Sequence, residues 1–128
     1  MQILKDCLFV GLGGFTGAIL RYLITLIPLK TQFPLTTFFV NISGAVIIGF
    51  IIGAAGALPN MNPQLILFLK TGLCGGYTTF STMSVEIVDL FRNNHSIISV
   101  VYIITTVVFC ILGVIFGGFL ASLVFRKV

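Results

Sequence analysis

Long apolar runs separated by short polar segments dominate the 128-residue chain. A helix needs about 20 apolar residues to cross the hydrocarbon core of a bilayer. Runs that qualify cover residues 8–29, 36–58, 63–90 and 97–125, and the third run is the least apolar. Transmembrane β-strands would instead alternate apolar and polar positions. The pattern therefore predicts an all-α membrane protein with four transmembrane helices in a single transmembrane domain, residues 1–128.

The composition agrees with lipid as the main solvent of this chain. Hydrophobic residues make up 58% of the sequence and charged residues only 8%, whereas soluble domains average about 25% charged residues. So few charges cannot provide a polar surface for a soluble domain of this size. The net charge of +4 comes from basic residues scattered singly along the chain. Because no basic cluster is present, we expect no nucleic-acid partner.

The sequence offers no set of residues suited to catalysis. Cys7, Cys74 and Cys110 stand apart in apolar sequence, without the spacing of a metal site or a redox pair. The single histidine, His95, follows two asparagines in a polar loop, so no Ser-His-Asp set is expected. The acidic residues are Asp6, Glu86 and Asp89. We therefore predict that the protein is not an enzyme.

Each predicted span contains one pair of glycines four residues apart. The pairs are Gly13 and Gly17, Gly49 and Gly53, Gly72 and Gly76, and Gly113 and Gly117. This spacing places both glycines on one helix face, where two backbones can approach closely. The glycines therefore predict a tightly packed helix bundle.

Basic residues are nearly balanced between the two ends of that bundle. Four spans place both termini on one side, and the bias of Lys and Arg across short loops sets the orientation of a membrane protein. One side holds Lys5, Lys70, Arg126 and Lys127, and the other holds Arg21, Lys30 and Arg92. Four against three leaves two alternatives: one weakly determined orientation, or insertion both ways up with assembly as an antiparallel homodimer.

Two polar side chains lie inside predicted spans and need partners there. Asn41 is about two turns into the second span, with Thr37 one turn before it. An amide in lipid faces protein or water, so Asn41 either lines an ion path or bonds a neighbouring helix. Arg21 lies late in the first span. Its side chain either reaches the membrane interface or attracts anions to a vestibule.

The third predicted span contains the richest polar run of the chain. Gly75 and Gly76, followed by the β-branched Thr78 and Thr79, are unfavourable for a helix, so we expect the third helix to be broken near its middle. Freed carbonyls would suit a small cation such as Na⁺, and uncharged hydroxyl donors would suit a small anion. Alternatively, these hydroxyls bond back to their own helix. The hydroxyls belong to Thr78, Thr79, Ser81, Thr82 and Ser84.

Three segments follow one another along the chain: the motif Gly13-Gly14-x-x-Gly17-x-x-x-Arg21, the segment Thr37 to Asn41, and residues 75–84 with Glu86. Together they resemble the Fluc family of small dual-topology fluoride channels. The resemblance implies an antiparallel homodimer in the lipid bilayer of the cell inner (plasma) membrane. It also implies two fluoride pores, a central structural sodium ion at the dimer interface, and passive export of fluoride that relieves its toxicity.

The resemblance further implies a role for individual residues. The sodium ligands would be the backbone carbonyls of Gly75 and Thr78, and the vestibule arginine would be Arg21. Met83 stands where the family usually has a second phenylalanine, which a natural variant and an engineered substitution would both explain. The implied pore and fluoride-binding residues are Asn41, Phe80, Met83, Ser81, Thr82, Thr37, Tyr102 and Thr106.

Two other membrane functions fit a chain of four short spans. A small proton-coupled multidrug-type exporter needs a carboxylate deep in its first span, and the only charge in span 8–29 is Arg21. A non-transporting membrane assembly subunit would not need a hydroxyl-rich, broken third helix. A fluoride channel therefore remains the function that the sequence favours, and flux from the purified chain separates it from an assembly subunit.

Overall fold

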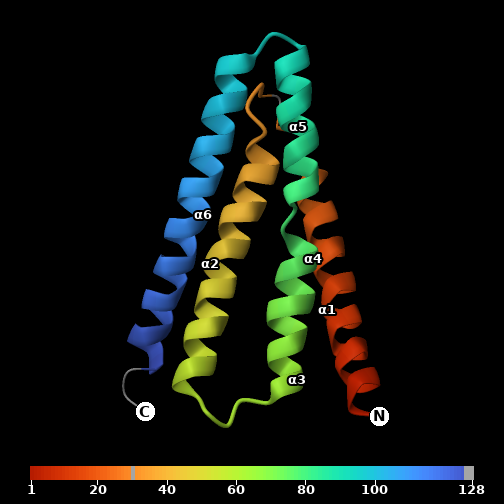
Figure 1. The fold of residues 1–128 in the computed structure, drawn as a ribbon, viewed down its shortest axis with the longest axis vertical. Coiled ribbons are helices and arrows are strands. Elements are labelled where there is room, and N and C mark those ends of the chain that lie inside the picture. Colours follow the sequence, from red (N-terminus) through yellow and green to blue (C-terminus); the bar gives the residue numbers. More distant parts are fainter. Residues whose placement is uncertain (30, 126–128) are drawn as a thin grey trace.

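The structure, a computed structural model, describes residues 1–29 and 31–125. Helices follow one another along the described chain as α1 (Gln2–Thr25), α2 (Leu35–Ala57), α3 (Pro63–Ile66), the π-helix η1 (Leu67–Cys74), α4 (Gly75–Tyr77), α5 (Phe80–Arg92) and α6 (Ser96–Phe125). They make four passes along an elongated bundle, and α1 begins at the end of the bundle where α6 finishes (Figure 1). The prediction of an all-α chain is confirmed. Lys30, Arg126 and Lys127, which entered the charge comparison, lie outside the described residues.

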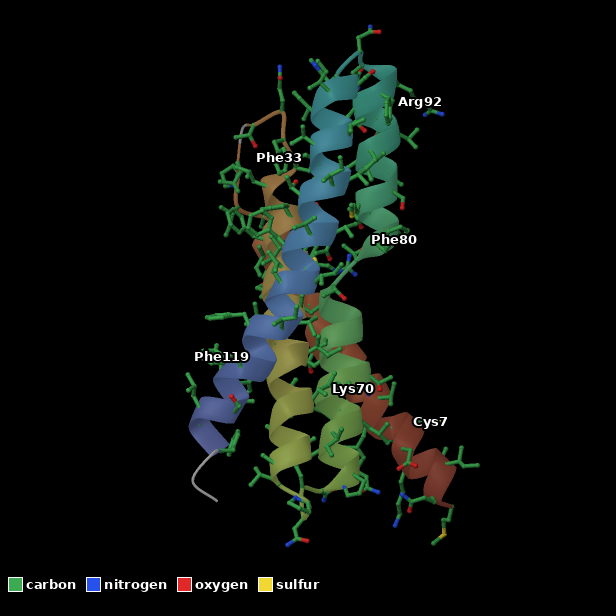
Figure 2. The ribbon with its side chains drawn as sticks, turned by 60° about the vertical axis from the view of Figure 1, so that its left-hand side comes forward. Cys7, Phe33, Lys70, Phe80, Arg92 and Phe119 are labelled. Atoms are coloured by element: carbon green, nitrogen blue, oxygen red, sulfur yellow. The ribbon has the colours of Figure 1, made fainter. Side chains whose placement is uncertain are left out.

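Three helices are long and apolar enough to cross a membrane by length and composition. These are α1, α2 and α6, with mean hydropathies of 1.7, 2.2 and 2.7. The third pass is divided among α3, η1, α4 and α5, the longest of which has 13 residues. Large apolar side chains such as Phe15 and Phe119 point outward, and Figure 2 shows Phe119 on the outer side of α6. Apolar surface of this extent is typical of helices that contact lipid.

The first helix is displaced toward the N-terminus relative to the apolar run 8–29. At its start, the Gln2 amide donates to Asp6 Oδ1 over 3.0 Å, one turn further along, which supports helix before the apolar run begins. At its end, Pro28 disfavours the helical conformation of Ile27. The helix has therefore ended before residue 29, although the apolar sequence continues.

The four passes associate through close backbone contacts at glycines. One contact joins α1 to η1 and α4, and the other joins α2 to α6. A Cβ added at Gly72 would lie 2.8 Å from the Cα of Gly13, and one added at Gly49 would lie 2.9 Å from the Cα of Val114. A real Cβ does not come this close to backbone, so only glycine permits these separations. The glycine spacing had predicted tight packing, and the backbones are close at these positions.

The π-helix η1 determines which residues of the third pass face each neighbour. Its hydrogen bonds join residues five apart instead of four, so residues four or five apart share a face. Gly72 and Leu73 lie against α1, whereas Lys70 and Cys74 face a groove on the other side. The sequence pattern contained no signal for this π-helix.

A small apolar cluster fixes α5 against α6. Its buried members are Met83, Leu90 and Tyr102. The ring of Phe33, in the loop before α2, packs edge-on against Tyr102 with ring centroids 5.2 Å apart. The loop between α1 and α2 thus covers one end of the cluster, and the cluster holds α5 in place beside α6.

Replacing Gly49 with alanine should lower the stability of the bundle. The added methyl group would collide with the backbone of Val114, and overpacking of this kind costs about 1–3 kcal/mol. Gly56, on the same helix, has open space within 4 Å of an added Cβ, so Gly56→Ala should be neutral or slightly stabilising. Thermal unfolding followed by circular dichroism in detergent measures both. Equal melting temperatures for Gly49→Ala and the wild type would contradict the close packing of α2 on α6.

Candidate functional site

Thr78 and Thr79 separate α4 from α5 in extended conformations. Their φ and ψ angles are −77° and 159° for Thr78, and −152° and 112° for Thr79. The Thr79 hydroxyl accepts a hydrogen bond from the backbone N–H of Thr82 over 3.2 Å and so caps the start of α5. The Thr78 hydroxyl and backbone N–H both donate to the carbonyl of Cys74. We refer to residues 78–79 below as the α4–α5 junction.

The Asn41 side chain binds the backbone of this junction at two points. Its Nδ2 donates to the carbonyl oxygen of Thr79 over 3.1 Å, and its Oδ1 accepts the N–H of Thr79 over 2.8 Å. Turning the amide over would set donor against donor and acceptor against acceptor, so the backbone fixes its orientation. Asn41 is buried. The amide therefore has its partners in a neighbouring segment of the same chain.

Arg21 approaches the same region from α1. Its Nε donates to the carbonyl oxygen of Gly76 over 3.2 Å, and the pair is half-buried. Gly76 lies one residue before the end of α4, and helix C-termini carry partial negative charge that attracts cations. The guanidinium is thus directed at the third pass of the chain.

A second polar cluster joins α2, α5 and α6 around Glu86. The Thr37 hydroxyl donates to Glu86 Oε1 and the Tyr102 hydroxyl donates to Glu86 Oε2, each over 2.7 Å. The Tyr102 side chain is fully buried and Thr37 is 5% exposed. One turn further along α6, the Thr106 hydroxyl donates to the carbonyl of Tyr102. No role was predicted for Glu86 from the sequence, although an acidic residue inside a predicted span is itself a signal of function.

The hydroxyls of the polar run divide into two groups. Those of Thr78 and Ser84 bond carbonyls four residues earlier in the chain, as the alternative reading of the sequence expected. The hydroxyls of Ser81 and Thr82 instead lie 3.3 and 3.0 Å from that of Thr79, at the exposed start of α5. The structure therefore gathers Thr79, Ser81 and Thr82 into one cluster and leaves the Glu86 cluster separate from it.

A groove of about 570 Å³ runs along one face of the bundle beside the junction. Phe80 lines this groove and is 77% exposed. Figure 2 shows Phe80 at the start of α5, next to the junction. Met83 also lines the groove but is only 3% exposed, because it packs in the cluster with Tyr102. The predicted site residues that line the groove are Asn41, Gly75, Thr78, Phe80, Met83 and Thr106.

Backbone carbonyls at the junction are the groups best suited to a cation. The hydrogen bonds described in this segment go to the carbonyls of Cys74, Gly76 and Thr79, which leaves those of Gly75 and Thr78 for another ligand. Both residues line the groove. Among residues 1–29 and 31–125, no group of three or more His, Cys, Asp or Glu side chains could hold a metal ion. Carbonyl oxygens such as those of Gly75 and Thr78 are ligands that suit a hard cation.

Residues 8–118 match the family described as "CrcB-like protein, Camphor Resistance (CrcB)". The chain belongs to this CrcB family. Its relatives include proteins named "Fluoride-specific ion channel FluC" from three bacteria. The one from Ruminiclostridium cellulolyticum is 40% identical over 125 residues, which are 95% of this chain and 96% of the relative. The one from Clostridium perfringens is 41% identical over 128 residues, which are 98% of this chain and 100% of the relative. The one from Flavobacterium psychrophilum is 44% identical over 103 residues, which are 78% of this chain and 83% of the relative.

Membership of the CrcB family confirms the resemblance on which the sequence analysis relied. The relatives carry the names of channels and not of enzymes, in agreement with the prediction that this chain is not an enzyme. The family match over residues 8–118 spans the junction, the groove and the Glu86 cluster.

Removing the Tyr102 hydroxyl should destabilise this CrcB-family chain. Tyr102→Phe keeps the buried ring but leaves the half-buried Glu86 Oε2 without the donor it has in the structure, and a hydrogen bond contributes about 0.5–1.5 kcal/mol to stability. Tyr22→Phe is the matched control, since Tyr22 is 62% exposed. Thermal unfolding in detergent measures both variants. A Tyr102→Phe protein as stable as Tyr22→Phe would show that the Glu86 cluster adds nothing to stability.

Proposed function

We propose that this chain is one subunit of a fluoride-selective passive ion channel of the cell inner (plasma) membrane. Such a channel would let fluoride leave the cell down its gradient and so relieve its toxicity. The observation that carries the proposal is the CrcB-family relationship, with relatives about 40% identical over nearly their full length that are named fluoride-specific channels. The junction and its groove supply a physical basis for it.

We propose that two copies assemble as an antiparallel homodimer across the groove. The groove is mostly apolar, yet its lining includes Lys70, Asn41 and the backbone of the junction. Polar groups of this kind are costly to leave against lipid and are better covered by protein. The near balance of basic residues on the two sides of the bundle is compatible with insertion both ways up. Antiparallel pairing would create two equivalent pores.

The carbonyls of Gly75 and Thr78 are the proposed ligands of a central structural sodium ion. Both residues line the groove, so pairing of two copies would bring carbonyls from each toward the dimer axis. Carbonyl oxygens are suitable ligands for a hard monovalent cation. A bound sodium ion would neutralise the carbonyl dipoles there and link the two copies. The third helix would then be broken, with residues 63–77 and α5 as its two parts around the ion.

Fluoride would pass along uncharged donors and an aromatic edge. The rim of the Phe80 ring is electropositive and can face an anion, and hydroxyl donors can replace part of the hydration of fluoride without binding it too tightly. Arg21 would lie at the vestibule. Met83, buried beside Tyr102, would support the path with a polarizable thioether in place of a ring. The proposed pore residues are Asn41, Phe80, Met83, Ser81, Thr82, Thr37, Tyr102 and Thr106.

Fluoride efflux from liposomes that contain only the purified chain tests the proposed function. With valinomycin to balance charge through potassium, fluoride should leave rapidly without any proton gradient, while chloride should stay inside. A fluoride electrode and a chloride electrode measure the two rates. A proton-coupled exporter would require a proton gradient, and an assembly subunit would release neither anion. If liposomes that contain folded, dimeric protein retain their fluoride, the proposal is refuted.

Phe80→Ala should reduce fluoride efflux in a dimer that still assembles. Phe80 is 77% exposed, so its removal should cost little stability, whereas the anion loses the ring edge. We expect the rate to fall by about tenfold, the factor that about 1.4 kcal/mol of lost stabilisation produces. Phe119→Ala, which removes an outward ring of α6, is the control and should transport normally. Equal efflux from both variants would exclude Phe80 from the pore.

A further inference from the structure

We propose that Arg21 and Asn41 are positioning residues that hold the polypeptide backbone on the two sides of Thr78. Each would act through hydrogen bonds from its side chain to backbone groups. The inference deepens the proposed channel function and rests on it. The backbone that the two side chains hold contains Gly75 and Thr78, whose carbonyls are the proposed cation ligands. We call these two side chains the junction clamp.

The first side of the clamp depends on the approach of α1 to α4. A Cβ added at Gly17 would lie 2.7 Å from the backbone nitrogen of Tyr77, so the two backbones are nearly in contact. Arg21 lies one turn after Gly17 on the same helix face, which brings Nε within 3.2 Å of the Gly76 carbonyl. The guanidinium is therefore anchored to backbone in a half-buried position.

The second side of the clamp is the two-point bond between Asn41 and Thr79. Both the N–H and the carbonyl of Thr79 pair with one buried amide, at 2.8 and 3.1 Å. Holding both groups of one residue fixes the peptide planes before and after its Cα. Because Thr79 also caps α5, the amide sets the direction in which α5 leaves the junction.

The clamp determines which carbonyls remain available at the junction. Arg21 binds the carbonyl of Gly76 and Asn41 binds that of Thr79. Gly75 and Thr78, whose carbonyls are the proposed cation ligands, each directly precede one of these bound residues and line the groove. Loss of either side chain should let the freed carbonyls turn toward the groove and disorder the proposed cation site.

Substitutions of Arg21 separate a positioning role from electrostatic attraction of anions. In glutamine, Nε2 is bonded to Cδ just as Nε is in arginine, so Arg21→Gln keeps the donor and removes the charge. Fluoride efflux should stay within about threefold of wild type in Arg21→Gln, and should fall about tenfold in Arg21→Met, which lacks the donor. Arg21→Lys keeps the charge without the Nε donor. Wild-type efflux in Arg21→Lys together with a loss in Arg21→Gln would overturn the proposal for Arg21.

Hydrogen exchange of the full-length protein in lipid nanodiscs tests Asn41 without reference to transport. Asn41→Ala removes the acceptor of the Thr79 N–H, so exchange in peptides that cover residues 77–82 should accelerate about tenfold. Asn41→Asp retains an acceptor of the same shape and should keep the exchange slow. Ser84→Ala, whose hydroxyl bonds only the carbonyl of Phe80, is the control. Exchange in Asn41→Ala at the wild-type rate would overturn the proposal for Asn41.

The two measurements also separate failure of the clamp from failure of the channel. If wild-type protein releases no fluoride but Asn41→Ala still accelerates exchange at the junction, the proposed function fails and the clamp stands. If wild-type protein conducts fluoride, while Asn41→Ala exchanges as slowly as wild type and Arg21→Met conducts as well as Arg21→Gln, the clamp fails and the channel stands.

Discussion

A backbone that leaves helical geometry inside a membrane must have its N–H and carbonyl groups satisfied by protein, because lipid offers them nothing. At Thr79 the amide of Asn41 satisfies both backbone groups, and the Thr78 N–H bonds the carbonyl of Cys74. Arg21 binds the carbonyl of Gly76 beside them. Each of these partners is near only because the passes are close together. The glycine contacts that join α1 to the third pass are therefore a condition for the junction to exist.

The same constraint connects packing to function. Glycines lie at the close contacts between helices. The polar clusters of the bundle lie elsewhere, at the junction and around Glu86. The Asn41 amide and the hydroxyls of Ser81 and Thr82 are donors near the junction that carry no formal charge. A small, strongly hydrated anion can exchange water for such donors and still leave, whereas a fixed ammonium in its path would hold it. The arrangement thus suits passive conduction better than tight binding.

Local features of this protein could be predicted from sequence, and long-range ones could not. The apolar runs marked the passes and the glycine pairs marked the helix contacts. Gly75 and Gly76 are themselves helical, and only Thr78 and Thr79 are extended. Glu86 was missed because its partners Thr37 and Tyr102 lie 49 and 16 residues away. The π-helix was missed because hydropathy does not distinguish hydrogen bonds to the fifth residue from those to the fourth. The roles assigned to the pore residues rest on the family resemblance and stay predictions.

The most direct test of the account is the reversal potential of a planar bilayer that contains the purified protein, with potassium fluoride on one side and potassium chloride on the other. If the junction and groove form a fluoride-selective path, the current should be carried by fluoride alone, and no chloride current should appear at any voltage. A reversal potential near zero, which equal permeation of the two anions would give, would contradict the account, as would a current carried by potassium.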